Sequence, residues 1–423
     1  MEEHPVRPTV DDDRSRSRLT VFFRLLLAIP LLIWLAVWSI GVVFAAIGGW
    51  FAALFTGRLP AGIHRFLAAY VRYTLHMSAY IGLVANPYPS FTGEPGYPVD
   101  VAIPDPEPQS RWKTAFRLFL AIPALILAGT LGSGTGGGGG TRDSEKWSWL
   151  SSTGVGGVAA VCAFLGWFAA MATGRMPLGL RDLGAYGIGY AAQANAYLLL
   201  LTERYPSSDP EALGPAWSLP DHPVRLELAD DGRRSRLTVF FRLLLAFPHF
   251  VWVTLWSVAA FFAGVVNWFA ALIRGRSAQP LHRFLGAFVR YSAHLDAYVF
   301  LVANPFPGFT GAPGYPVDIT IPPVEPQSRT ITFFRLFLAI PAFILMFALN
   351  VVLFVVALLG WFYALVKGRM PTGLRNLGAV SIRYLSQTNA YAFVLTERYP
   401  FAGPALQAPP QPVVAAEPAE AAA

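Results

Sequence analysis

The sequence predicts a mainly α-helical integral membrane protein, built from four tandem helical-hairpin units with about eight transmembrane helices. Composition is the first of two observations behind this prediction. Hydrophobic residues make up 54% of the 423 residues and charged residues only 13%, well below the charged share of an ordinary soluble domain. Four stretches are long, apolar and almost free of charge, as membrane spans are. The second observation is that the same sequence motifs recur along the chain.

The repeats divide the chain into units. RSRLTVFFRLLLA occurs at Arg16–Ala28 and again at Arg234–Ala246, and Phe23-Arg24-Leu25 returns more weakly as Phe116-Arg117-Leu118. We therefore expect a first tandem copy over residues 1–218 and a second over residues 219–403. Their hairpin units are 1–92 and 93–218, then 219–310 and 311–403. The Ala/Pro-rich tail, residues 404–423, has the composition of a disordered segment.

Each unit opens with a short segment of strand character. In unit two, Tyr97, Val99, Val101 and Ile103 alternate with other residues, so they share one face of a strand. Because an isolated strand is unstable, we expect the four copies to pair into one small cytoplasmic sheet. Extended linkers without a sheet are the alternative. The counterpart segments are Pro5–Val10, Pro223–Leu228 and Pro316–Ile321.

The apolar run that follows predicts two spans. In unit one it covers Leu19–Thr56, which would measure about 57 Å as one helix, whereas one crossing needs about 20 residues. We therefore expect a hairpin with its tip near Ser39. Unit two carries a glycine-rich, charged insertion at the corresponding midpoint, where such a tip would lie. The alternative is a single long helix with a kink at Pro30.

Charge predicts orientation. Nearly all of the 32 Lys and Arg residues lie near a hairpin base, including the Gly-Arg pair that follows each apolar run. Four units in the same orientation, with cytoplasmic termini, fit this pattern. Each unit then crosses an even number of times. The amphipathic helix after Gly-Arg, about residues 61–84 in unit one, is therefore expected to lie at the membrane interface.

The arginine of the Phe-Arg-Leu phrase is the first candidate functional residue. A charge about two turns into a span is costly and suggests function. One interpretation is a side chain that extends to the phosphate region, and the sharper one is binding of a lipid phosphate or a partner carboxylate. The four residues are Arg24, Arg117, Arg242 and Arg335.

A polar stripe on the amphipathic helix is the second candidate. Hydrogen bonding and headgroup anchoring are the favoured roles, because Gln replaces His in units two and four, which argues against proton transfer. No metal site, cofactor motif or catalytic residue is expected, since the His residues lack ligand spacing on one helix and no nucleophile motif occurs. The stripe residues are Arg72, His76 and Tyr80 in unit one and Arg290, His294 and Tyr298 in unit three.

Several phrases carry a family resemblance. RLTVFFRLLLAIP, WFAALFTGRLP and LVANPYPSFTG, with GYPVDV and EPQSR, resemble bacterial membrane proteins of the domain of unknown function 4389 family, familiar from actinobacterial genomes. The resemblance covers about residues 1–400 in tandem copies, and units two and four match less closely. It implies a bacterial membrane protein and carries no activity, cofactor or catalytic residue.

Two functions follow as hypotheses. The first is a non-enzymatic protein of the bacterial cell envelope, a scaffold or a lipid- or partner-binding protein. Its partners would be membrane lipids, including anionic headgroups, and a protein partner or a second copy, with no nucleic acid. The alternative is a channel or transporter formed around an axis through the four units.

Overall fold

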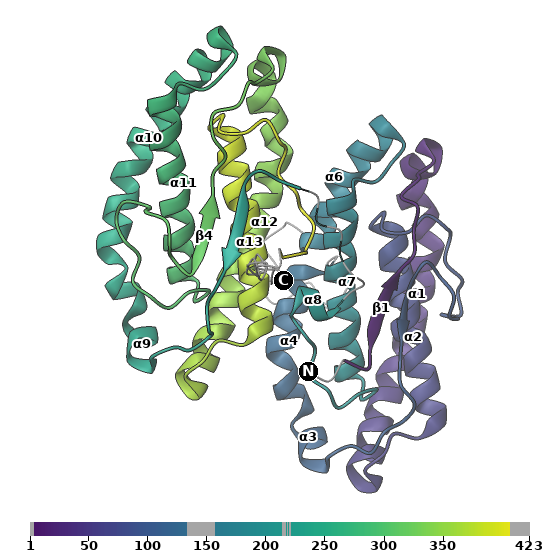
Figure 1. The fold of residues 1–423 in the computed structure, drawn as a ribbon. Helices are drawn as coiled ribbons and strands as arrows, with labels where there is room; N and C mark the ends of the chain where they lie inside the picture. The colour runs from purple at the N-terminus through teal and green to yellow at the C-terminus, as the bar shows by residue number, and fades with distance from the viewer. Residues whose placement is uncertain (1–3, 133–156, 214–216, 218, 220, 407–423) are drawn as a thin grey trace, which may run out of the picture.

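The computed structural model describes residues 4–132, 157–213, 217, 219 and 221–406. Each unit contains a long helical rod, a shorter helix and a strand (Figure 1). The rods are α1 (Arg18–Thr56), α3 (Arg111–Ala115) with α4 (Arg117–Leu131) and α6 (Val158–Thr173), α9 (Arg236–Leu245) with α10 (Phe247–Arg274), and α12 (Arg329–Lys367). The shorter helices are α2 (Ala61–Ile81), α7 (Leu178–Leu198), α11 (Gln279–Val299) and α13 (Thr372–Ala392). The strands are β1 (Arg7–Val10), β2 (Val99–Ala102), β3 (Arg225–Leu228) and β4 (Val317–Thr320), and a single turn, α8 (Pro210–Leu213), joins the tandem copies.

The apolar run is one helix, so the prediction of two spans with a tip near Ser39 is wrong. Both α1 and α12 continue through that level over 39 residues. The Ser39 hydroxyl donates to the Leu35 carbonyl of its own helix, and a lone glycine costs a helix only about 1 kcal/mol, so the expected tip does not break it. Three helices of the described chain, Arg18–Thr56, Arg236–Arg274 and Arg329–Lys367, are long and apolar enough to cross a membrane.

The insertion in unit two is joined to its rod at the midpoint of that rod. A Cβ atom on Gly157 would lie 2.3 Å from the Gly132 carbonyl oxygen and 2.7 Å from that of Gly129. The first turn of α6 therefore sits directly on the last turn of α4, and the two helices form one interrupted rod. Residues 133–156 lie outside the described chain. Gly132 and Gly157 lie at the midpoint of a rod, a position that the repeat alone does not distinguish from a hairpin tip.

Neighbouring rods run in opposite directions. The Trp50 indole near the end of α1 donates to the Thr114 carbonyl at the start of the unit-two rod (2.8 Å), and Trp167 near the end of α6 donates to the Val21 carbonyl at the start of α1 (3.2 Å). The second tandem copy repeats both bonds, with Trp268 to Thr332 at 2.6 Å and Trp361 to Val239 at 3.2 Å. The prediction of four units in one orientation is therefore wrong, because the units alternate.

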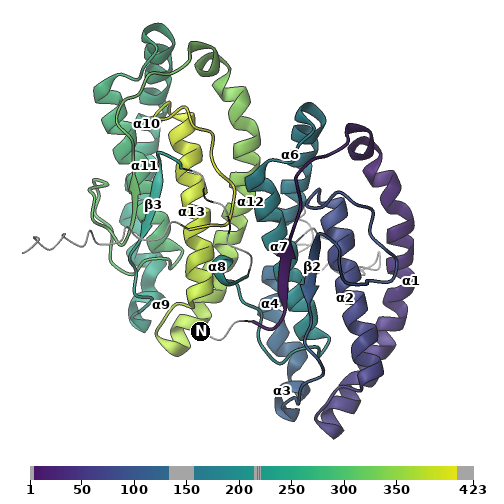
Figure 2. The same cartoon turned by 45° about the vertical axis from the view of Figure 1, so that its right-hand side comes forward.

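The rods form a row in the order α10, α12, α4–α6, α1, as their contacts and Figure 2 show. The shorter helices pack on the rods as a second layer, and the strands pack on α2, α7, α11 and α13 as a third. The helices expected at the membrane interface thus form the middle layer, with most of the second half of α2 buried.

The strands are confirmed, but they form two separate sheets. β1 pairs antiparallel with β2, and β3 with β4. Because each sheet joins the two inverted units of one tandem copy, each copy closes its own pair and no four-stranded sheet forms. Val99 and Val101 face inward as the alternation predicted, whereas Arg225 and Glu227 face out from β3.

The two tandem copies pack against each other through close backbone contacts. A Cβ atom on Gly179, at the start of α7, would lie 2.9 Å from the backbone nitrogen of Ala402. A Cβ atom on Gly373, at the start of α13, would lie 2.7 Å from the nitrogen of Asp209. In each copy the segment that follows α7 or α13 therefore packs on a glycine of the other copy, and only glycine allows this approach.

Candidate functional site

Arg24 caps the end of the shorter helix of its own unit. Its Nη1 donates to the carbonyls of Tyr80 (2.6 Å) and Ala85 (3.0 Å), and its Nη2 donates to Asn86 Oδ1 (3.0 Å). The guanidinium carbon lies 4.4 Å from the centre of the Tyr80 ring. Carbonyls at a helix C-terminus have no partner within the helix, and the fixed fork of the guanidinium supplies several donors at once.

The same cap occurs in all four units. Arg117 binds the carbonyls of Tyr197 and Thr202, Arg242 those of Tyr298 and Ala303, and Arg335 those of Tyr391 and Thr396, at 2.5–3.0 Å. A side-chain oxygen completes each set: Gln109, Asn304 and Gln327 take the place of Asn86. The tyrosine rings lie 4.3–4.6 Å from the guanidinium carbons.

These caps correct both interpretations of the motif arginines. The four side chains are 0–2% exposed, so they neither extend to the phosphate region nor reach a lipid phosphate. A charge that looked costly in a lipid-facing helix is instead held on helix carbonyls inside the protein, where several hydrogen bonds offset its desolvation.

A left-handed residue shapes each cap. Leu83, Leu200, Leu301 and Val394 follow the shorter helices with φ between 58° and 64°, a conformation that costs a residue with a Cβ atom about 1–2 kcal/mol. It turns the chain so that carbonyls on both sides of the turn face one arginine. Arg16 adds bonds to the carbonyls of Leu83 and Val84 at 2.8–3.2 Å. The repeated caps offset the cost of the strained turn.

In unit one the polar stripe of α2 binds a strand carboxylate. His76 Nε2 lies 3.1 Å and Arg72 Nε 3.3 Å from Asp100 Oδ1 in β2, and the Gly96 backbone nitrogen donates to Oδ2 at 2.8 Å. The Tyr97 ring packs on the His76 ring, with centroids 4.7 Å apart. Unit three repeats the cluster with His294 at 3.0 Å and Arg290 at 3.4 Å from Asp318.

Units two and four fasten the strands through glutamine. Gln193 Nε2 donates to the Val6 carbonyl beside β1 (2.7 Å), and Gln387 Nε2 to the Val224 carbonyl beside β3 (3.0 Å). Their carbonyl oxygens accept from the backbone nitrogens of Ser207 and Phe401. Hydrogen bonding is thus the role of the stripe, as expected. Headgroup anchoring is not, because His76, His294, Tyr80 and Tyr298 are buried under the strands and loops.

Hydrogen bonds stabilise the charged form of the aspartate in each cluster. Burial alone would raise the pKa of Asp100, but the hydrogen bonds from His76, Gly96 and Val101 lower it below its ordinary value. The equivalent donors His294, Gly314 and Ile319 lower the pKa of Asp318 in the same way against the effect of its burial. Burial raises the pKa of Tyr80 and of Tyr298, so both phenols stay protonated. Within the described residues no three His, Cys, Asp or Glu side chains come together as a metal site.

Asp100 and Asp318 are the residues that the sequence reasoning missed. Their signal was present, because the phrase Gly-Tyr-Pro-Val-Asp occurs at both positions. By itself, however, this motif predicts only a strand. The end-to-end bonds of Trp50 and Trp167 were also missed, since tryptophan near the ends of apolar helices is usual in membrane proteins and suggested no partner.

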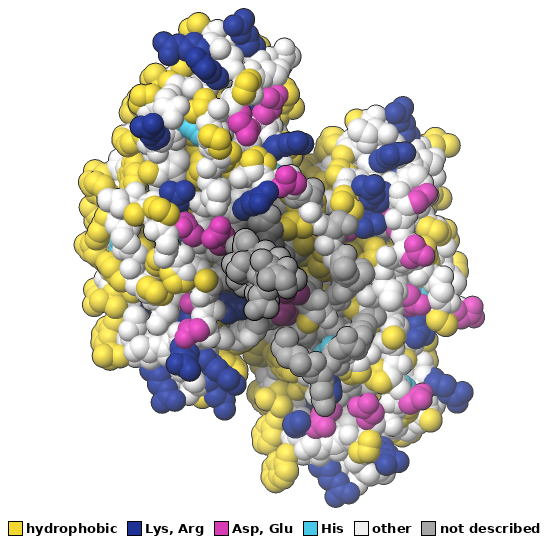
Figure 3. All heavy atoms as spheres, in the orientation of Figure 1, with side chains coloured by type: hydrophobic (Ala, Val, Ile, Leu, Met, Phe, Trp, Pro, Cys, Tyr) yellow, Lys and Arg dark blue, Asp and Glu magenta, His cyan; other side chains and the backbone are white. Residues whose placement is uncertain are grey.

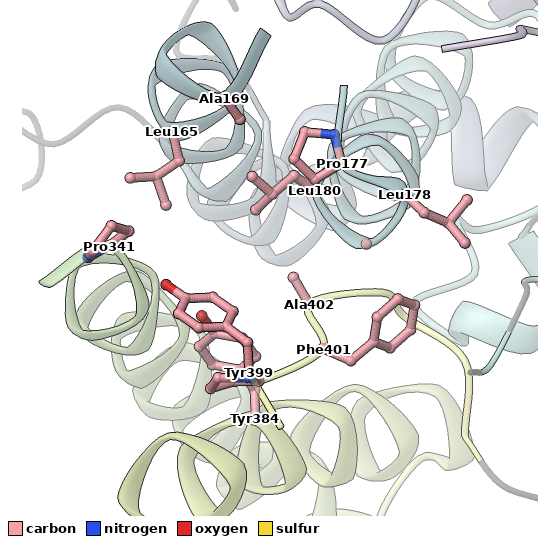
Figure 4. Close-up of a pocket in the computed structure, with 12 residues that line it drawn as sticks. Leu165, Ala169, Pro177, Leu178, Leu180, Pro341, Tyr384, Tyr399, Phe401 and Ala402 are labelled. Carbon is pink, nitrogen blue, oxygen red and sulfur yellow. The ribbon is translucent and has the colours of Figure 1, made fainter. Parts of the chain in front are cut away.

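A cavity of about 510 Å³ lies between the two tandem copies (Figure 4). Leu165, Ala169 and Leu180 line it from the first copy, and Tyr384 and Phe401 from the second. The lining is almost wholly apolar, with tyrosine hydroxyls as its polar groups. Unit four carries Tyr363 where unit two carries Ala169, so a small residue leaves this space open.

Comparison with known proteins gives one match. The model of the family described as domain of unknown function, DUF4389, matches residues 18–93, 150–208, 236–310 and 329–403. Curated proteins and solved structures give no match. The four matched ranges fall one in each unit and together span more than half of the chain. The chain therefore belongs to the DUF4389 family, as four tandem copies of its domain.

Proposed function

We propose that this chain is a non-enzymatic membrane protein of the bacterial cell envelope, a scaffold that works by binding lipid. The exposed apolar surface of the rods supports this proposal. Phe44 and Phe55 on α1, Phe261 on α10, and Phe337 and Phe354 on α12 are each more than 60% exposed. Contiguous apolar surface on this scale needs a partner, and its length and composition suit acyl chains.

Charge supports a lipid partner too. Exposed basic side chains stand at both ends of the rods, among them Arg18 and Arg58 at the two ends of α1 and Arg111 and Arg175 at those of the unit-two rod. Such side chains suit anionic headgroups around an apolar surface. The polar clusters inside the protein bind its own backbone, and this use of them favours a scaffold over an enzyme.

A channel is the weaker candidate. A transport path needs polar residues around a common axis, whereas the rods stand in a row and bury arginines that cap helices. The cavity between the tandem copies is apolar and suits an acyl chain better than an ion.

The test is reconstitution of the full chain with liposomes. We expect it to float with the vesicles, to retain anionic lipid in native mass spectrometry, and to give no ion flux. Exchange of the exposed Arg18, Arg58, Arg111 and Arg175 for Gln should reduce that retention. As the control for a single exchange such as Arg58→Gln, Arg225→Gln removes one charge from the exposed face of the strand layer and should leave retention unchanged. Flux through the liposomes, or no flotation, would refute the proposal.

A further inference from the structure

The strand layer lies beside the middle of the rods. The Tyr73 hydroxyl donates to the Leu31 carbonyl (2.8 Å) and the Tyr70 hydroxyl lies 2.9 Å from Ser39 Oγ, which places this part of α2 next to the centre of α1. Arg72, between these tyrosines, contacts Asp100 of β2. The two-stranded sheet therefore stands at mid-height, as Figures 1 and 2 show.

Charged side chains of this layer face outward at the same height. Glu227 of β3 pairs in register with Asp318 of β4, and both Glu227 and Arg225 are exposed. Figure 3 shows acidic and basic side chains over this face, including its middle. If the rods stood upright in a bilayer, these charges and the open edges of two-stranded sheets would lie at the depth of the hydrocarbon core, where neither is tolerated against lipid.

The length of the uncharged part of α1 also argues against an upright rod. Residues 25–56 contain no charged residue and form about 48 Å of helix, against a hydrocarbon core of about 30 Å. Tilt sufficient to fit this length exceeds the range seen for membrane helices. The charged insertion of unit two also joins its rod at Gly132 and Gly157, halfway along. An upright rod would place that junction at the bilayer centre.

Basic side chains are not concentrated at one end of the row of rods. Because neighbouring rods are antiparallel, Arg18 at the start of α1 donates to the Ala172 carbonyl at the end of α6 (3.0 Å), so both termini of the row carry starts and ends of rods together. The charge asymmetry that orients spanning helices is therefore absent from the described rods.

We propose that the row of rods lies flat in one leaflet of the membrane, with its bare apolar face among the acyl chains and the strand layer in water. This inference rests on the proposed lipid binding and replaces the multi-pass topology. The exposed basic residues at both rod ends then meet headgroups of the same leaflet. Apolar volume inserted into one leaflet only would expand that leaflet, which makes membrane bending the specific action of the scaffold.

Cysteine labelling of the full chain in the cell membrane tests the orientation. Single variants Ser17→Cys and Arg58→Cys mark the two ends of α1, and Glu227→Cys marks the strand layer; all three positions are exposed. A membrane-impermeant maleimide should label all three from the same side in intact spheroplasts or in inverted vesicles. Labelling of Ser17→Cys and Arg58→Cys from opposite sides would overturn the proposal. The native Cys162 is fully buried and should react only after denaturation, which shows that each variant is folded.

Depth measurement is an independent check. Spin labels at Leu19, Phe44 and Phe55, all about equally exposed, should report the same shallow depth in liposomes. A deep label at Phe44 between two shallow ones would show an upright rod and refute the inference. Failure of the protein to bind liposomes at all would refute the proposed function instead, so the two failures are distinct.

Discussion

A buried arginine holds each of the four units together internally. Arg24, Arg117, Arg242 and Arg335 connect the second turn of each rod to the C-terminus of the following helix, over a tyrosine ring. Lysine could not replace them, because one ammonium group lacks the planar fork that reaches two carbonyls and a side-chain oxygen together.

Loss of one cap should destabilise the fold. We expect Arg335→Gln to lower the free energy of unfolding by about 3–5 kcal/mol, because the buried carbonyls of Tyr391 and Thr396 lose their donor. Tryptophan fluorescence during denaturation in detergent measures this. The control, Arg58→Gln at an exposed position, should stay within about 0.5 kcal/mol. Equal losses in both variants would show that the cap contributes nothing.

Asp296 predicts a pH dependence. Burial raises the pKa of this α11 carboxyl from 3.8 to about 7, so the folded state binds the proton more tightly than the unfolded state. The contribution of Asp296 to stability is then greatest below about pH 3.8 and falls as pH rises towards 7. Asn195 and Asn389 occupy the equivalent positions in units two and four. Asp296→Asn should therefore raise the melting temperature above pH 7 and leave it unchanged near pH 4.

Asp318 supplies a control of opposite sign. Its pKa is lowered by the hydrogen bonds from His294 and two backbone nitrogens, which outweigh its burial. It therefore stabilises the fold above about pH 4 and loses this effect as pH falls through its folded pKa. Asp318→Asn should lower the melting temperature at pH 7. The same direction of change in both variants would contradict the assignment.

At the scale of the element, the rod is the unit of construction. Left-handed glycines end the rods at Gly57, Gly174, Gly275 and Gly368, as glycine commonly ends helices. Between its two ends a rod tolerates a proline, a glycine or even a complete insertion. In unit two the halves of the rod, α4 and α6, both pack on α7, which keeps them in line without unbroken helical bonds.

Removal of the insertion should therefore be harmless. Deletion of residues 133–156 joins Gly132 to Gly157, which already adjoin, and we expect the melting temperature and liposome binding to be retained. Deletion of Asn350 and Val351 at the matching level of α12 is the control. It rotates the rest of that helix by about 200° and moves its buried stripe to the surface. A comparable loss of fold in both variants would refute the interrupted-rod description.

At the scale of the molecule, the C-terminal segment packs against Gly179 of the first copy and is held there by α13 of its own copy. Arg383 of α13 is buried and donates to the carbonyls of Gly403 and Ala405, and Gln387 accepts from the Phe401 backbone nitrogen. Residues 401–406 are thus part of the fold, although the composition placed 404–406 in a disordered tail. The remainder of that predicted tail, residues 407–423, lies outside the described chain.

Two truncations test this contact. A chain ending at residue 406 should unfold like the full protein, within about 0.5 kcal/mol. A chain ending at Pro400 leaves the buried Arg383 without its carbonyl partners and should lose about 3–5 kcal/mol. Denaturation followed by tryptophan fluorescence compares them. Unchanged stability of the shorter chain would show that the contacts of residues 401–406 contribute nothing to stability.

The sequence by itself determined the four units, their strands, the shorter helices and the strongly apolar rods, because repeats, alternation and composition are local properties of the chain. Only the tertiary structure decided whether a rod turns back, which way each unit points and where the motif arginines lie. These depend on contacts between segments far apart, such as Arg24 with Tyr80 and Trp50 with Thr114. A buried arginine and one that reaches a headgroup occupy the same place in an apolar sequence, and the carbonyls that distinguish them become visible only when the next helix packs alongside.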